Sequence, residues 1–174
     1  MNTNSQWCKE LASAAHEYCL LIEDLERLDE GLLERLSRLL PRIHAAVMAL
    51  DNAAMANYPR AEGPDLDRRF ELYDRLHRML GDRDGYLLEY DSYEDISGVS
   101  GSLADDFTDI YFELRKGLDL MSGQPDGLHR AVMYWYGGYL WHWGQHLVDA
   151  ERHLYDLQVH RKLGPIASYS SYHN

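Results

Sequence analysis

The stretch MYWYGGYLWHWGQH, residues 133–146, carries three of the four tryptophans of the chain and lies inside its longest helical pattern. Between about residues 126 and 162, apolar side chains recur at spacings of three and four, as on one buried helix face. This face consists of Val132, Tyr136, Trp143, Leu147 and Leu154. A more polar stripe borders it, made of Trp135, Tyr139, His142, His146, Asp149 and His153. Imidazoles, aromatic rings and a carboxylate on one stripe make it the expected location of a site.

The helix expected before this one begins at Ser102, a favourable N-cap residue, and runs to about Met121. The short turn SGQPDG, residues 122–127, predicts that the two helices form an antiparallel hairpin. Counting outward from this turn places three acids level with three polar groups: Asp109 with His142, Asp106 with His146, and Glu113 with Tyr139. The helical period puts Asp106 and Glu113 beside the apolar face, and Asp109 farther round, near solvent, where its side chain faces either His142 or water.

Three earlier helical patterns complete the predicted fold, at about residues 4–28, 32–50 and 65–80. Pro41 lies inside the second pattern, where it either kinks the helix or starts a new one. PRAEGP, residues 59–64, reads as a linker, and Gly-rich residues 81–101 predict a long irregular loop that packs on the helices. We therefore expect an all-α, up-and-down bundle of four to five helices, one domain over residues 1–164, followed by a mobile Ser/Tyr-rich tail at 165–174.

Three interpretations of the polar stripe remain open. The favoured one is structural: Asp–His and Glu–Tyr hydrogen bonds that fix the register of the hairpin. The second is a divalent-metal site, because histidines four residues apart can address one ion, with carboxylates from the facing helix; its candidates are Asp106, Asp109, His142 and His146. The third is a ligand groove beside the Gly137-Gly138 pair, with Glu113, Trp135, Tyr139, Trp143 and Asp149 as supporting residues.

Composition narrows the classes of function. A net charge of −12 argues against binding to nucleic acid, whose phosphates an acidic surface repels. The sequence has neither an apolar run long enough for a membrane span nor a secretory signal, so a cytoplasmic location is expected. Cys8 and Cys19 would lie about 16 Å apart on one helix, too far for a disulfide, and are expected to remain thiols. Motifs for nucleotide binding, serine hydrolysis and thiol redox chemistry are missing, which favours a protein that is not an enzyme.

The run SGSLADDFTDIYFELRKGL, residues 100–118, followed by WHWGQH, residues 141–146, resembles a bacterial family of all-helical proteins, domain-of-unknown-function family 5063. The resemblance implies a helical fold in a bacterial, cytoplasmic protein, and it implies no reaction. The residues themselves favour a non-enzymatic binding or scaffold module with a protein partner or self-association, through a surface that includes an exposed Trp141. No cofactor is expected under that interpretation. The alternatives are a divalent-metal-binding, hydrolytic bundle and an acidic immunity-type partner of a basic protein.

Overall fold

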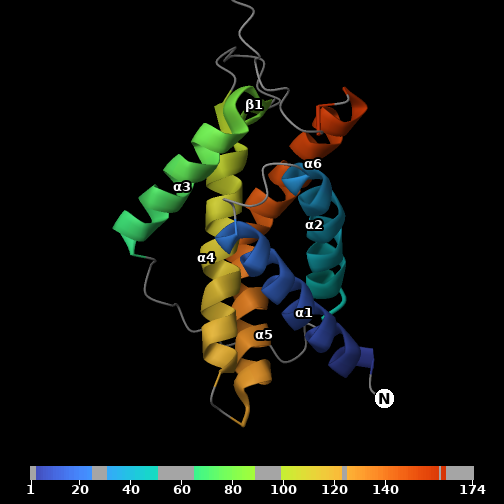
Figure 1. Cartoon of the computed structure of the whole chain (residues 1–174). Coiled ribbons are helices and arrows are strands. Elements are labelled where there is room, and N and C mark those ends of the chain that lie inside the picture. Colours follow the sequence, from blue (N-terminus) through green and yellow to red (C-terminus); the bar gives the residue numbers. More distant parts are fainter. Residues whose placement is uncertain are drawn as a thin grey trace, which may run out of the picture.

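The fold is an all-α bundle, as predicted, in a computed structural model that describes residues 3–24, 31–50, 65–88, 99–122, 125–160 and 162–163 (Figure 1). The elements are α1 (Thr3–Glu23), α2 (Leu32–Met48), α3 (Leu66–Leu80), the 3-10 turn η3 (Gly81–Arg83), β1 (Gly85–Leu88), β2 (Val99–Ser102), α4 (Leu103–Met121), α5 (Gly127–Gly138), the π-helical turn η4 (Tyr139–Trp143) and α6 (Gly144–Val159). The predicted fifth helix is therefore α5, η4 and α6 in succession. The predicted linker at 59–64 and tail at 165–174 lie outside the described residues.

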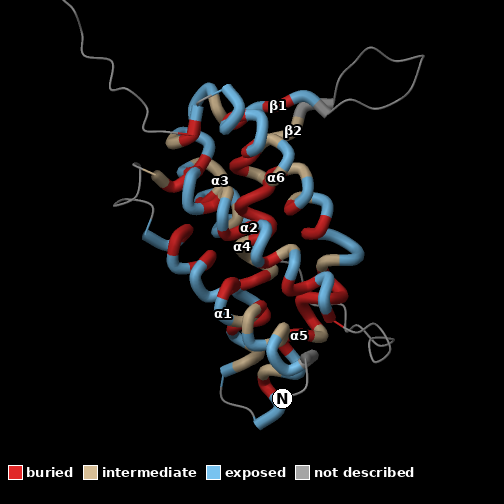
Figure 2. The backbone as a smooth tube through the Cα atoms, turned by 90° about the vertical axis from the view of Figure 1, so that its right-hand side faces the viewer, coloured by how far each residue is buried: buried red, intermediate tan, exposed pale blue. Residues whose placement is uncertain are grey.

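Helix α4 occupies the centre of the bundle and packs against α1, α3, α5 and α6, while α2 packs against α1 and α6 (Figure 1). The buried positions of each helix face inward, and exposed positions cover the outside (Figure 2). The largest side chains of the core have almost no exposed surface and come from five helices and η4: Tyr18, Leu36, Ile43, Leu76, Phe107, Trp135 and Trp143. The apolar spacing of the sequence thus yields one continuous core that holds α4 against its neighbours.

The predicted helix starts are confirmed at α3 and α4. The carboxylate of Asp65 accepts a hydrogen bond from the amide of Asp67 at 3.0 Å. The hydroxyl of Ser102 accepts one from the amide of Asp105 at 3.2 Å. These side chains satisfy amides that have no partner within the helix, so each marks where its helix begins. Helix α2 continues through Pro41, which rules out a new helix starting at that residue.

Residues 85–88 and 99–102 form an antiparallel hairpin, so the prediction of a wholly irregular loop before α4 is wrong at these positions. Tyr86 pairs with Gly101, where a side chain on Gly101 would collide with the tyrosine ring. The ring of Tyr86 is buried, so this residue packs on the bundle as predicted, whereas Leu87 beside it is exposed. Strands of four residues carry too few alternating positions to stand out among glycines and aspartates.

Two sequence-based expectations about the chain as a whole can be compared with the described residues. None of the helices described is both long and apolar enough to cross a membrane. Cys19 is buried and Cys8 partly buried on α1, and both are thiols, as predicted.

Candidate functional site

The structure brings the four predicted polar residues together between α4 and the η4–α6 segment. His146 Nδ1 lies 2.9 Å from Asp106 Oδ1, so the pair predicted from the hairpin is present. The other nitrogen, His146 Nε2, lies 3.1 Å from Asp109 Oδ2. His142 Nε2 approaches the same Asp109 oxygen at 3.9 Å. Asp109 therefore faces both histidines. Its predicted neighbour was His142, and the structure places His146 beside it as well.

Each of the two imidazoles lies between two carboxylates. His142 Nδ1 is 3.1 Å from Glu113 Oε1, and its Nε2 faces Asp109. His146 has the same arrangement with Asp106 and Asp109. The ring centroids of the two histidines are 5.3 Å apart and the ring planes are 79° apart. Two imidazole nitrogens thus converge on one carboxylate oxygen, while each opposite nitrogen is bonded to a carboxylate of its own.

The π-helical turn η4 sets this arrangement. A π turn adds a residue to one turn of a helix, and such turns are frequent at functional sites. His142 lies in η4, and the widened turn directs it to Glu113 in place of Tyr139. The predicted bond between Tyr139 and Glu113 is therefore wrong: the Tyr139 hydroxyl lies 2.9 Å from His44 Nε2 on α2. Glu113 is instead bonded to His142, three residues further along the chain.

Arg69 on α3 is a member of the site that sequence reasoning missed. Its Nε and Nη2 donate to Asp109 Oδ1 and Oδ2, both at 2.8 Å, and Nη2 also donates to Asp105 Oδ1 at 2.9 Å. The side chain of Asp109 is only 8% exposed, because α3 covers it. Of the two orientations that the sequence left open for Asp109, the structure has the one that faces the histidines. The hydrogen bonds to Asp109 raise the pKa of Arg69 despite its partial burial.

Tyr86 of the hairpin completes the surroundings of Asp106. Its hydroxyl donates to Asp106 Oδ2, while Oδ1 of the same carboxylate is bonded to His146. Burial raises the pKa of Asp106, against the opposing effect of the hydrogen bonds from His146 and Tyr86. Burial lowers the pKa of His146, but the bond to Asp106 and the charge of Asp109 outweigh it, so the net pKa of His146 is raised. The loop before α4 gave no sequence signal that Tyr86 would reach this site.

The tryptophans of the opening stretch divide between core and surface. Trp135 and Trp143 are fully buried, and their indole N–H groups donate to the carbonyls of Leu114 at 3.1 Å and Trp135 at 3.0 Å. They therefore do not line a groove for a ligand, contrary to that interpretation. Trp141 is 82% exposed, in line with its predicted position away from the core.

The remaining supporting residues have local roles. Gly138 allows Glu113 to approach the helix closely, since a Cβ at this position would lie 2.9 Å from Glu113 Oε2. Asp149 accepts a hydrogen bond from Gln145, one turn away, at 2.8 Å and is not part of the histidine cluster. A side chain at Gly138 would also lie 3.0 Å from the indole of Trp143, so glycine makes room here for two neighbouring side chains.

Comparisons with known proteins support the fold. A family model described as "Domain of unknown function (DUF5063)" matches residues 2–160. The crystal structure of protein BF1032 from Bacteroides fragilis is similar to this chain, with a TM-score of 0.68 and 19% sequence identity, over 95% of this chain and 94% of that one. At this identity the similarity shows the fold alone. No curated protein matches the chain.

Proposed function

The chain belongs to the DUF5063 family, which is described only as a domain of unknown function, and we propose that in this member Asp109, His142 and His146 bind one divalent metal ion. The observation that carries the proposal is the pair of imidazoles whose Nε2 atoms face one oxygen of Asp109. One ligand atom from each residue lies within 4.8 Å of the other two. Two histidines and one carboxylate are a common ligand set for zinc and for ferrous iron.

The separations are compatible with one ion bound by all three side chains. Zinc–ligand bonds of about 2.0–2.1 Å in tetrahedral geometry place neighbouring ligand atoms roughly 3.3 Å apart. The distances from Asp109 Oδ2 to the two Nε2 atoms are 3.1 and 3.9 Å, on either side of that value. The side chain of His142 is 50% exposed, so its ring can rotate and solvent can reach the site.

The outer hydrogen bonds favour the same role. Histidines that bind metals usually donate their second ring N–H to a carboxylate or carbonyl, which fixes the tautomer and the direction of the free lone pair. Glu113 and Asp106 occupy that place for His142 and His146 respectively. Arg69 holds Asp109 through both oxygens, each of which retains a lone pair. Asp109 is therefore oriented and remains able to act as a ligand.

Three protein ligands leave coordination positions for water or a substrate. A zinc ion held in this way would supply a water of lowered pKa or polarise a carbonyl or phosphoryl oxygen, which is hydrolytic chemistry. The residues of this chain would hold the ion, orient the ligands through Asp106, Glu113 and Arg69, and leave one side of the site open at His142. The proposal thus gives a chemical role to the two histidines of the opening stretch.

The test is metal analysis of the untagged protein purified without chelator, followed by calorimetric titration with Zn²⁺ after chelator treatment. We expect near-stoichiometric binding that is lost in both His142→Ala and His146→Ala. His129→Ala is the matched control, because His129 is exposed on α5, away from the cluster. Asp106→Asn should weaken binding about 10- to 100-fold. Binding that is unaffected by either cluster variant, or no binding by the wild-type protein, would leave hydrogen-bonded pairing as the role of the cluster.

A second candidate function, contact with a protein partner or a second copy of the chain, is favoured by one observation. Trp141 and Leu140 are 82% and 57% exposed, side by side in η4. Exposed tryptophan is uncommon on monomers and enriched at interfaces. Light scattering of the wild-type protein should then give a mass above that of one chain, with or without chelator. The Trp141→Ala protein should have the mass of one chain. A single-chain mass in the wild-type protein would exclude self-association.

A further inference from the structure

The proposed metal site lies among acidic side chains of α4. Four of these acids are a proposed ligand or are hydrogen-bonded to a ligand or to Arg69: Asp105, Asp106, Asp109 and Glu113. Asp109 is three or four residues from each of the others, so all four lie on one side of the helix. Burial raises the pKa of Asp106, and hydrogen bonds from His146 and Tyr86 oppose this effect. Carboxyl groups ionise at about pH 4, so at about pH 8 this side of α4 is strongly negative.

Arg69 is the permanent cation that contacts these acids in the described part of the chain, and its donor fork is already occupied. Its Nε and Nη2 donate two hydrogen bonds to Asp109 and one to Asp105. Arginines that bind phosphate point this fork at the ligand, whereas here it points at Asp109. Lys116, the next cation along this side of α4, is about 10 Å from Asp109 along the helix axis, with Glu113 between them.

A divalent ion would not reverse the sign of this region. Four carboxylates against one guanidinium leave three negative charges, and an ion bound by neutral imidazoles contributes two positive ones. The region therefore stays negative with the ion in place, within a chain whose net charge is −12. Such a region lowers the local concentration of anions, most strongly of those that carry two charges.

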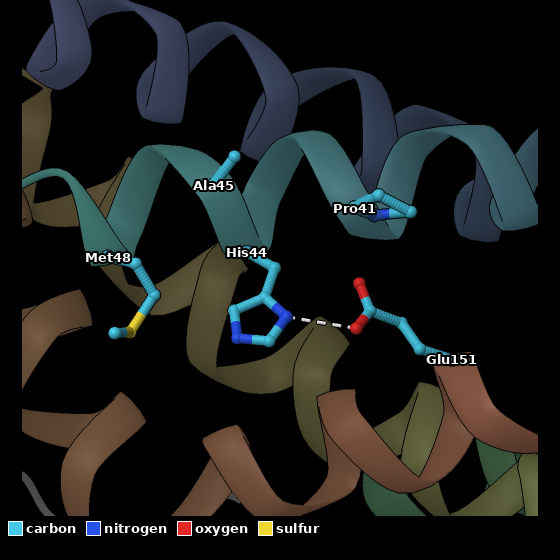
Figure 3. Close-up of a pocket in the computed structure, with 5 residues that line it drawn as sticks. All are labelled: Pro41, His44, Ala45, Met48 and Glu151. Atoms are coloured by element: carbon cyan, nitrogen blue, oxygen red, sulfur yellow. Dashed lines mark hydrogen bonds and ion pairs between the residues drawn. The ribbon is translucent and has the colours of Figure 1, made fainter.

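A second acid–imidazole pair contacts η4 and brings no net positive charge to it. His44 Nε2 lies 2.9 Å from the hydroxyl of Tyr139 in η4, and His44 Nδ1 lies 2.9 Å from Glu151 Oε2. Figure 3 shows the carboxylate of Glu151 facing this ring at a depression whose other walls are uncharged, formed by Pro41, Ala45 and Met48. Any positive charge that the imidazole of His44 carries thus has a carboxylate directly against it.

The open side of the proposed metal site is uncharged as well. The side chains of Asp109 and His146 are 8% and 22% exposed, against 50% for His142, so a further ligand reaches the ion from the side of His142. Leu140 and Trp141, the two residues before His142 in η4, are exposed and carry no charge. Apolar side chains beside the approach to an ion suit an uncharged group of a ligand.

We propose that the open side of the site formed by Asp109, His142 and His146 accepts an uncharged carbonyl group, as in an amide or an ester, and rejects phosphate and other multiply charged anions. The inference rests on the proposed metal site and narrows its substrates from carbonyl and phosphoryl compounds to carbonyl compounds. The observation that carries it is the direction of Arg69: the cation that would hold a phosphate is bonded to Asp109 and Asp105 instead.

The experiment uses the full-length protein at about pH 8 loaded with Co²⁺, which takes the same nitrogen and oxygen ligands as zinc and whose visible spectrum changes when a further ligand binds. The probes are imidazole, which is uncharged, and inorganic phosphate. We expect imidazole to bind at least tenfold more tightly than phosphate. Added sodium perchlorate should strengthen phosphate binding, because salt screens repulsion, and should leave imidazole binding unchanged. Phosphate that binds as tightly as imidazole, or that binds more weakly in salt, would overturn the proposal.

Asp105→Asn tests the charge directly, since Asp105 is neither a proposed ligand nor bonded to one of the histidines. The substitution removes one negative charge and should strengthen phosphate binding by at least about threefold, with imidazole binding unchanged within twofold. Asp119→Asn is the matched control, because Asp119 is exposed on the same helix, ten residues from Asp109, and its loss changes the net charge equally. Equal phosphate affinity in the two variants would refute the electrostatic argument.

The same preparations separate failure of the metal site from failure of the substrate class. A protein that takes up no Co²⁺ would overturn the metal site, and this inference with it, before any probe is added. A protein that binds Co²⁺ and loses it in His142→Ala, yet binds phosphate as tightly as imidazole, would keep the proposed function and overturn the substrate class alone.

Hydrolysis gives a second readout with two esters that share a leaving group, 4-nitrophenyl acetate and 4-nitrophenyl phosphate. In the first, water adds across the C–O bond of the ester, and acetate and 4-nitrophenol are released. We expect the zinc-loaded protein to accelerate this reaction over buffer, and the acceleration to disappear in His142→Ala. Acceleration of the phosphate ester, or none of the acetate ester, would contradict the proposed substrate class.

Discussion

Gly117→Ala reverses the sign expected from helix propensity, because of what lies against α4. In an exposed helix this change stabilises by about 0.5–1 kcal/mol. Here the added Cβ would come closer to the indole of Trp135 than the 3.0 Å that real Cβ atoms keep. Trp135 is fully buried and its Nε1–H donates to the carbonyl of Leu114 at 3.1 Å, so the ring cannot move aside without losing this bond. Overpacking costs about 1–3 kcal/mol and a lost buried hydrogen bond about 1 kcal/mol more.

The net expectation is a loss of about 2 kcal/mol in the free energy of unfolding. With a urea dependence of about 2 kcal/mol per molar, the midpoint of unfolding would fall by about 1 M. The assay is urea unfolding followed by tryptophan fluorescence and circular dichroism, which should give coincident transitions. Lys116→Ala, one residue away and exposed, is the control and should change stability by less than about 0.5 kcal/mol. A Gly117→Ala protein that is more stable than wild type would refute the close packing of Trp135 on α4.

Three further predictions concern other features of the bundle. Burial raises the pKa of the Cys19 thiol to about 12, so little of it is thiolate at mildly alkaline pH. Iodoacetamide should therefore label Cys8 before Cys19 in the folded protein and should label the two cysteines equally in urea. Mass spectrometry of the labelled peptides measures both rates. Tyr86→Phe leaves Asp106 without one hydrogen-bond donor and should lower the free energy of unfolding, measured in urea, by about 1–3 kcal/mol. An unchanged free energy of unfolding would show that this hydrogen bond does not stabilise the fold. Pro41→Ala restores a backbone N–H within α2 and should raise the melting temperature; a decrease would indicate that Pro41 is needed by its neighbours.

The parts of the fold that the sequence predicts are those set by local chemistry. Each helix cap, at Asp65 and at Ser102, and the apolar spacing of α4 involve residues only a few positions apart. These features therefore form in the same way whatever the rest of the chain does. The pairing of β1 with β2 joins strands that are ten residues apart in the chain, and short strands carry little periodic signal. Local signals therefore give the helices and miss the hairpin.

The candidate site was predictable only where one short turn relates its two helices. The turn before α5 places Asp106 level with His146, and the structure contains that bond. No comparable rule positions α3, so Arg69 and the burial of Asp109 could not be derived. The placement of Tyr139 failed for a different reason: counting from the turn gives the height of a residue along its helix but not its direction, and the Tyr139 hydroxyl faces His44 of α2. Tertiary packing, rather than residue type, decides these contacts.

The π-helical turn also has a consequence for how this chain could have arisen. Such a turn is equivalent to one residue inserted into an ordinary α-helix, and one residue corresponds to a rotation of about 100°. Everything after Trp143, including His146 and Glu151, is out of phase with α5 by that inserted residue. A single-codon deletion within η4 would rotate α6 and separate both residues from Asp106 and His44 at once. The contacts of His146 with Asp106 and of Glu151 with His44 are thus expected to be gained or lost together in related sequences.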